Sequence, residues 1–135
     1  MASFDINIIA RILSDFAWHA DRGQGDAMSQ LFIPEGTLRV GGQDLAGRQK
    51  IADDCHRRAL DPLRVVRHVC SNLRLDRVEA SIVTSTAIQI TFEQLGEGVP
   101  AQVRVNDLAD TFVLEADGVW RIASRIIQRQ IALTV

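Results

Sequence analysis

Residues 67–76 read RHVCSNLRLD, and this stretch opens the second half of the chain with the pattern of a β-strand. β-Branched and aliphatic residues recur from Val65 to Leu75, as is usual in strands. Side chains alternate between the two faces of a strand, so His68 and Asn72, four residues apart, are expected on one face. Building a strand requires neither residue type. The pair therefore suggests a functional site on a sheet.

Three further strands are predicted after this one, at about 81–94, 103–115 and 119–133. The segments between them contain DRVE, GEGVP and ADG and are short, which favours an antiparallel meander. Long strands twist, so this sheet is expected to curl.

The first half of the chain is predicted to be mostly helical. Apolar residues between Ile6 and Ala20 are spaced by three and four, as in an amphipathic helix. A short second helix is expected to end at Pro34, before a short strand over residues 36–42 and a third helix over residues 46–60. Helices followed by strands predict an α+β fold in the order α-α-β-α-β-β-β-β. A curled sheet around the first helix would leave a cavity at its open end.

The 135 residues, 47% hydrophobic and 24% charged, are expected to form a single domain spanning residues 1–135. A formal net charge of −2 argues against nucleic-acid binding, which requires a basic face. No apolar run reaches the ~18 residues of a membrane span, and MASFDINIIA lacks the positive charges of a signal peptide. Two isolated cysteines, Cys55 and Cys70, favour a reduced, cytoplasmic protein. The three histidines lack metal-ligand spacing, so neither metal nor cofactor is expected.

Asp21 and His68 are the first candidates for a site. Asp21 follows Leu13 and Ala17 at intervals of four, so it lies at the helix end, at the edge of the face that meets the sheet. It is either a solvated turn residue or a carboxylate at the cavity mouth. If the sheet folds over the helix, Asp21 would orient the His68 ring and leave its second nitrogen as a base. Otherwise His68 is an ordinary core or surface residue.

Asp110 interrupts the alternating apolar residues Leu108, Phe112 and Leu114 and is expected to point inward. It would act as an acid or hydrogen-bond donor, or form an ion pair with a nearby arginine. Another polar set lies on the strand at 81–94 and is expected to face solvent unless the curl turns it inward. That set is Ser85, Gln89, Thr91 and Glu93. Asp54 is expected on a solvated helix face.

Four segments in this order resemble the nuclear-transport-factor-2-like superfamily, and its SnoaL-like branch in particular. They are HADRGQGDAMSQLFIPEGTLRV, GRQKI, RHVCSNLRLD and ADTFVLEADGVWRIASR, and the resemblance runs from about Ile9 to Ile127. It implies a cone, that is, a strongly bent mixed sheet around the N-terminal helices with an open-ended pocket. Members are commonly dimers. Here a dimer is expected through the outer sheet face, formed by alternate residues from Arg67 to Leu75.

The resemblance also implies roles for particular residues. In scytalone dehydratase and hexachlorocyclohexane dehydrochlorinase an Asp–His pair removes a substrate proton, and Asp21 and His68 fall at those positions. Asn72 resembles a recurrent family residue. Asp110 falls on the carboxylic-acid donor of ketosteroid isomerase, although a second alignment turns Asp107 to the pocket instead. The chain departs from these enzymes in having no tyrosine.

The implied function is a small-molecule lyase or isomerase, such as a dehydratase, cyclase or isomerase, with a largely apolar substrate. Catalytic roles are expected for Asp21, His68 and Asp110. Pocket positions are expected for Phe16, Asn72, Glu93 and Phe112. The alternative is a non-catalytic ligand-binding or assembly subunit of the same fold.

Overall fold

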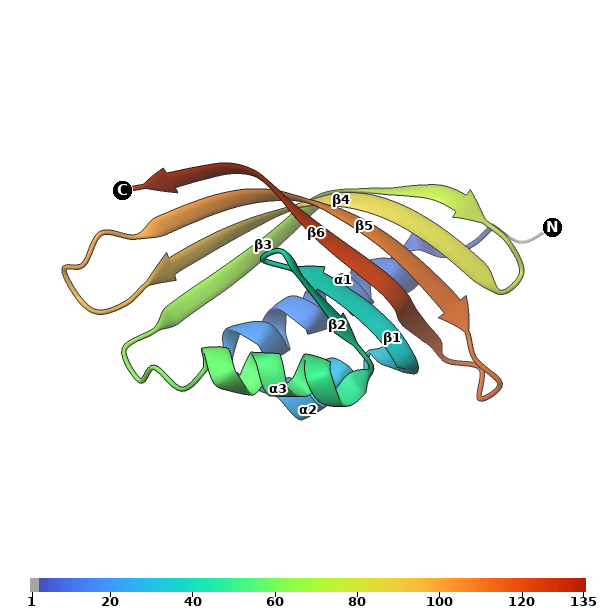
Figure 1. Ribbon diagram of the computed structural model, residues 1–135. Coiled ribbons are helices and arrows are strands. Elements are labelled where there is room, and N and C mark those ends of the chain that lie inside the picture. The colour runs from blue at the N-terminus through green and yellow to red at the C-terminus, as the bar shows by residue number, and fades with distance from the viewer. Residues whose placement is uncertain (1–2) are drawn as a thin grey trace.

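A strongly curved six-stranded sheet dominates the computed structural model, which describes residues 3–135 (Figure 1). The strands lie in the order β2-β1-β6-β5-β4-β3. The elements along the chain are α1 (Ile6–Asp21), α2 (Gly25–Ser29), β1 (Phe32–Val40), β2 (Gln43–Ala46), α3 (Arg48–Arg58), β3 (Val65–Val78), β4 (Ile82–Gln94), β5 (Gln102–Leu114) and β6 (Trp120–Thr134).

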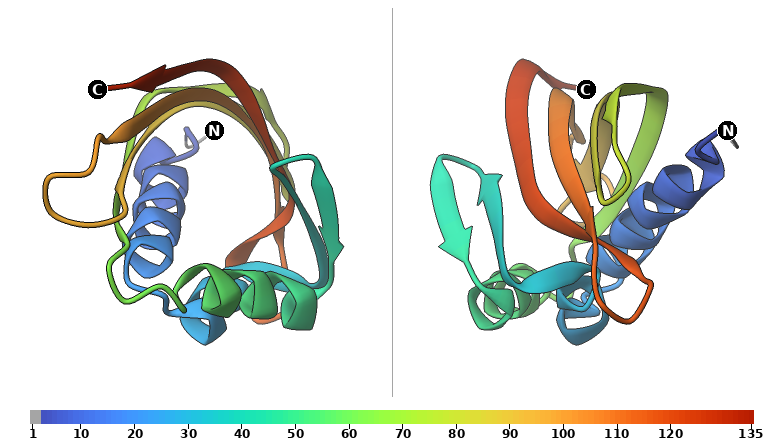
Figure 2. Two further views of the ribbon diagram at one scale, coloured as in Figure 1. Left: turned by 60° about the vertical axis from the view of Figure 1, so that its left-hand side comes forward. Right: turned by 90° about the vertical axis from the view of Figure 1, so that its right-hand side faces the viewer.

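The sheet arches over α1, so the helix lies inside its concave face (Figure 2). α1 packs against β3, while α2 and α3 pack together and α3 contacts β1. The resulting shape is the predicted cone of mixed α+β structure. β3 to β6 form the predicted antiparallel meander, and β1 runs parallel to β6.

Two predictions about the first half of the chain are wrong. Pro34 does not end a helix but lies within β1, where the pairing with β6 is interrupted between Phe32 and Thr37. A proline is tolerated there because no ladder hydrogen bond is lost. The sequence interpretation also missed β2, a four-residue strand that forms a hairpin with β1. Its sequence QDLA has almost no β-branched signal.

The core joins the buried stripe of α1 to the concave side of the sheet. Ile9, Leu13 and Phe16 pack in one cluster with side chains from β5 and β6, including Leu108 and Ile122. Burying each such side chain contributes roughly 1.5–3 kcal/mol, so this contact is what holds the helix under the arch.

A bulge at Asn72 changes the direction of side chains along β3. Asn72 has a φ of 57°, and β3 has one residue more than β4 at this point. Before the bulge His68 faces inward, and after it Leu73 and Leu75 pack on the core. Asn72 is exposed, so the prediction that it shares a face with His68 is wrong. The prediction that Leu73 and Leu75 face outward is wrong for the same reason.

No helix within residues 3–135 is long and apolar enough to cross a membrane. Cys55 and Cys70 are both free thiols. The cytoplasmic location stays a prediction.

Candidate active site

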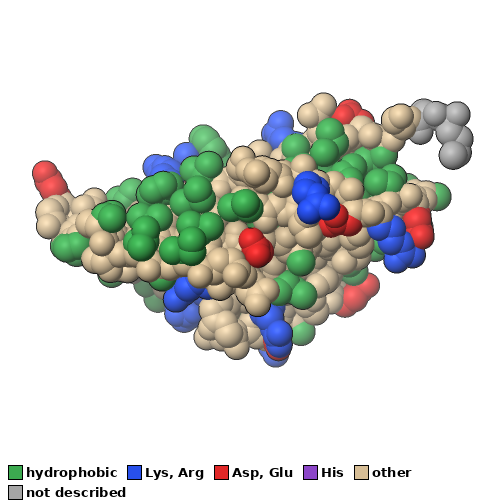
Figure 3. Space-filling model, turned by 90° about the horizontal axis from the view of Figure 1, so that it is seen from above, with side chains coloured by type: hydrophobic (Ala, Val, Ile, Leu, Met, Phe, Trp, Pro, Cys, Tyr) green, Lys and Arg blue, Asp and Glu red, His purple; other side chains and the backbone are tan. Residues whose placement is uncertain are grey.

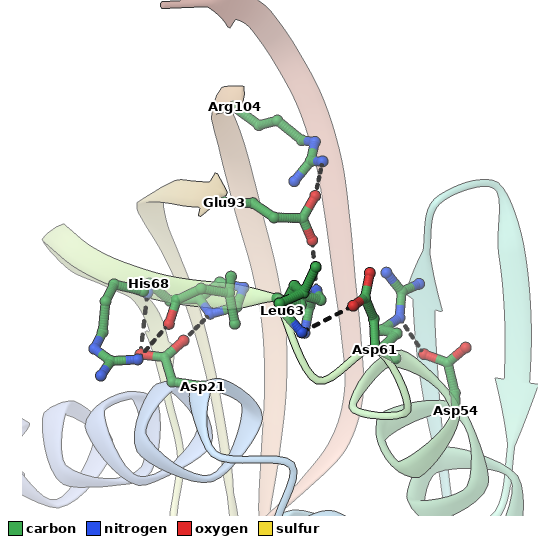
Figure 4. Close-up of polar contacts among 11 residues, drawn as sticks. Asp21, Asp54, Asp61, Leu63, His68, Glu93 and Arg104 are labelled. Carbon is green, nitrogen blue, oxygen red and sulfur yellow. Dashed lines mark hydrogen bonds and ion pairs between the residues drawn. The ribbon is translucent and has the colours of Figure 1, made fainter. Parts of the chain in front are cut away.

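Asp21 and His68 form the hydrogen bond predicted from the sequence (Figure 4). Asp21 Oδ1 lies 2.5 Å from His68 Nδ1, and Asp21 Oδ2 accepts the His68 backbone N–H at 3.2 Å. The side chains are only 5% and 15% exposed. Both carboxylate oxygens are thereby used to fix one residue.

The turn after α1 determines where Asp21 lies. Gly23 adopts a φ of 67°, and a Cβ at this position would lie 2.6 Å from the Cβ of Ala59. Only glycine allows this close approach without strain. The turn thus places the end of α1 against the end of α3, directly under β3.

The pairing decides which nitrogen of His68 is available for chemistry. An ionised carboxylate can only accept hydrogen bonds, so the Nδ1 atom of a neutral His68 carries the ring proton and donates a hydrogen bond to Asp21. Nε2 is then the basic nitrogen. His68 lines the main cavity, which places the imidazole ring at a wall that a bound molecule would contact.

The cavity has two connected parts. The outer part has a volume of about 460 Å³, within the range usual for small-molecule sites. A narrower inner chamber of about 70 Å³ is lined by apolar residues, among them Phe16, Met28 and Leu38. His68 and Ile127 line both parts.

The outer part is lined by polar side chains of the concave sheet face. Gln89, Thr91 and Asn106 are buried and face the cavity. Of the two alternatives for Gln89 and Thr91, the inward one is observed, because the curl of the sheet turns this face towards the cavity. These side chains offer amide and hydroxyl groups to a ligand.

Glu93 lies at the cavity wall between two arginines. Arg64 Nε donates to it at 2.5 Å and Arg104 Nη2 at 2.7 Å. Partial burial acts to raise the pKa of the Glu93 carboxyl, but the hydrogen bonds from Arg104 and Arg64 outweigh it and hold the pKa below its ordinary value. Glu93 is therefore an anion at neutral pH and unsuited to act as an acid.

Asp54 is buried, contrary to the prediction of a solvated face, and lines the inner chamber. It accepts hydrogen bonds from Arg57 at 2.6 Å and Arg58 at 2.7 Å. Burial acts to raise the pKa of Asp54, yet Arg58 and Arg57 hold it below its ordinary value. The carboxylate thus fixes Arg58 at the boundary between chamber and outer cavity.

Asp110 points inward as predicted, but Arg125 holds its carboxylate. Arg125 donates to both oxygens, at 2.8 and 2.9 Å, and both side chains are fully buried. The Arg125 guanidinium carbon lies 4.3 Å from the ring centre of Phe16. Of the two interpretations, the ion pair is the one observed. Asp107 is exposed, so the face of β5 that carries Asp110 points inward and the face that carries Asp107 points outward.

The predicted site residues fall into two groups. The cavity walls bring together His68, Phe16 and Glu93, with Asp21 behind His68. Asp110 and Phe112 are buried and line neither the outer cavity nor the inner chamber, and Asn72 lies on the convex side. Four cavity-lining arginines were missed: Arg58, Arg64, Arg104 and Arg129.

Two other chemistries find little support. Burial raises the pKa of the Cys70 thiol, so Cys70 is a poor nucleophile. Among residues 3–135, no group of three or more His, Cys, Asp or Glu side chains is arranged to hold a metal ion.

The curved sheet around α1, with the Asp21–His68 pair at the wall of its cavity, has the fold of the nuclear-transport-factor-2-like proteins. The chain belongs to the SnoaL-like domain family, whose pattern matches residues 3–126. No protein with curated annotation matches the sequence.

Three solved structures are similar in fold. A proposed scytalone dehydratase from Novosphingobium aromaticivorans is 18% identical, with a TM-score of 0.84 over 96% of this chain and 87% of that one. A type 2 hexachlorocyclohexane dehydrochlorinase is 20% identical, with a TM-score of 0.82 and the same two coverages. A protein from Catenulispora acidiphila in complex with S-DNPA is 21% identical, with a TM-score of 0.79 over 91% of each chain.

Proposed function

We propose that this protein is a small-molecule enzyme of the lyase or isomerase type, with His68 as general base. The observation that carries the proposal is the Asp21–His68 pair, in which both carboxylate oxygens orient one histidine at a cavity wall. A positioned base of this kind typically contributes ~10²–10⁴ to the rate of a proton transfer.

In the proposed reaction Nε2 of His68 takes a proton from a carbon next to a carbonyl group. Asp21 stabilises the imidazolium that forms, and the electron pair moves onto the carbonyl oxygen. Gln89 and Asn106 offer amide N–H donors to that oxygen. Return of the proton to another carbon completes an isomerisation, and departure of a leaving group completes an elimination. Neither Glu93 nor Asp110 is needed as an acid.

The similar structures support this proposal through what their names state. One is a dehydrochlorinase, an elimination enzyme by name, and another holds S-DNPA. The competing proposal is a non-catalytic ligand-binding or assembly subunit. Such a subunit would have the same cavity but no chemical role for His68. The two proposals therefore differ in whether the protein catalyses a proton exchange that depends on His68.

Deuterium exchange measures that property without knowledge of the natural substrate. A panel of small cyclic ketones, neutral and carboxylated, is incubated with the protein in ²H₂O and followed by NMR. We expect wash-in of deuterium next to the carbonyl group of at least one probe, by ~10²-fold or more over buffer, and a return to background in His68→Gln. If probes bind while wild type and His68→Gln exchange them equally slowly, the non-catalytic proposal replaces this one.

We also propose a homodimer through the convex face of the sheet. Val69, Ile90, Val105 and Ile131 lie in register across four strands, on the side away from α1. Figure 3 shows hydrophobic side chains gathered on this face. A second copy would cover such a row through the same row of its own, as two-fold symmetry requires.

A further inference from the structure

The mouth of the cavity carries more positive than negative charge. Arg58, Arg64, Arg104 and Arg129 line it, and the only carboxylates on the cavity and chamber walls within residues 3–135 are Glu93 and Asp54. Glu93 is shared by Arg64 and Arg104. Asp54 is shared by Arg58 and by Arg57, which is more than half exposed.

Arg129 differs from the other three arginines. Within residues 3–135 its guanidinium makes no ion pair and no hydrogen bond, although it lines the cavity. It lies opposite Asn106 on the concave face, and Arg104 is two residues from Asn106 along β5. β6 has one extra residue between Arg129 and Ile131, so the two arginines are not a regular diagonal pair, but both line the same cavity. Arg104 already pairs with Glu93, which leaves the Arg129 guanidinium as the positive charge without a partner within residues 3–135.

The inner chamber has the opposite character, with Phe16, Met28 and Leu38 on its walls. His68 lies at the boundary between this apolar chamber and the arginine-lined mouth. A molecule that satisfies both parts has an apolar body and an anionic end, with a reacting carbon between them.

We propose that the ligand is an organic carboxylate whose anionic group binds Arg129 and Arg104 and whose apolar body lies in the outer cavity against the opening of the inner chamber. That this ligand is also the substrate rests on the proposed function. The assignment replaces the expectation of a largely apolar substrate. Of the four arginines on these walls, Arg58, Arg64 and Arg104 pair with Asp54 or Glu93, and only Arg129 lacks a carboxylate partner within residues 3–135. One negative charge completes this pairing, so we assign a carboxylate rather than a doubly charged phosphate ester.

Three probes of similar shape test the assignment: 2-naphthoate, the uncharged 2-naphthamide, and 2-naphthyl phosphate. Binding is followed by NMR shifts of the Thr91 and Asn106 amides. We expect naphthoate to bind at least about tenfold more tightly than the amide, as charge-assisted hydrogen bonds imply. In Arg129→Gln this preference should fall to about threefold or less. In Arg74→Gln, an exposed arginine outside this cavity, it should be unchanged.

Equal affinity for naphthoate and naphthamide, no binding of either, or an unchanged preference in Arg129→Gln would overturn the proposal. Tighter binding of naphthyl phosphate than of naphthoate would overturn the choice of a carboxylate. His68→Gln separates this proposal from the catalytic one, since it should retain the preference for naphthoate. Retained preference without any His68-dependent deuterium exchange would leave the anion site standing and reject the enzyme.

Discussion

His68 depends on one carboxylate for its orientation, and Asp21→Asn tests that dependence. The asparagine amide can donate to Nδ1, which would favour the tautomer that has its proton on Nε2 and lacks the base. We expect proton exchange to fall by ~10²–10⁴ while the fold is retained. ¹⁵N shifts of the His68 ring report the tautomer directly. An unchanged tautomer with full activity would show that Asp21 does not position the ring.

Asp110 has a structural partner, Arg125, and this pair decides the effect of its substitution. An acid or hydrogen-bond donor at this position, the other alternative, would make Asp110→Asn neutral or stabilising. The buried bidentate pair with Arg125 instead predicts a loss of about 3–5 kcal/mol in the free energy of unfolding, because an unpaired charge remains in the core. Asp117→Asn is the control. Its pair with Arg121 lies at the surface, where solvent screens it, so urea unfolding should show little change.

The Glu93 cluster should make stability depend on acid pH. The pKa of Glu93 is lowered in the folded state from an ordinary value of 4.5, so the unfolded state binds its proton first. The stabilisation that the Glu93 charge contributes is therefore fully present above about pH 4.5. It is lost as the pH falls through the lower pKa that Glu93 has in the folded state. Wild type should exceed Glu93→Gln in stability at pH 7, and the gap should narrow progressively as the pH falls below about 4.5. A gap that is constant with pH would show that the charge of Glu93 does not contribute.

At the scale of elements, the bulge in β3 depends on Asn72. Asparagine tolerates a positive φ better than most residues, and β-branched residues tolerate it poorly. We expect Asn72→Val to destabilise the protein by about 1–3 kcal/mol and Asn72→Gly to be nearly neutral. Ser71→Val, one residue away and also exposed, is the control and should be neutral or slightly stabilising. Equal stability of Asn72→Val and wild type would contradict the strained backbone.

Long elements were predictable because their periodicity is strong. The four predicted strands match β3 to β6 within a few residues, and the amphipathic pattern of α1 was clear. For β3, which side chains face inward was not predictable beyond Asn72, because one extra residue inverts the alternation of side chains between the two faces of the strand. The arginines of the cavity were missed for a related reason. Arg104 faces Thr91 only through the pairing of β4 with β5, which spacing along one strand cannot reveal.

At the scale of the whole molecule, the proposed dimer predicts an effect on assembly alone. Val105→Lys places a charge in the centre of the apolar row, so the variant should be monomeric with unchanged circular dichroism. Leu60→Lys, at a 78% exposed position outside the sheet, should assemble like the wild type. Light scattering at micromolar concentration makes the comparison. A monomeric wild type would reject the dimer.

The bulge at Asn72 also divides β3 into two parts that differ in what their substitution would change, which matters for protein engineering. Before it His68 belongs to the ligand-facing wall, and after it Leu73 and Leu75 belong to the packing of the core. Substitution at position 68 would therefore alter the cavity, whereas substitutions at positions 73 and 75 would alter the stability of the fold. A library designed to change ligand recognition should accordingly leave the part of β3 that follows Asn72 unchanged.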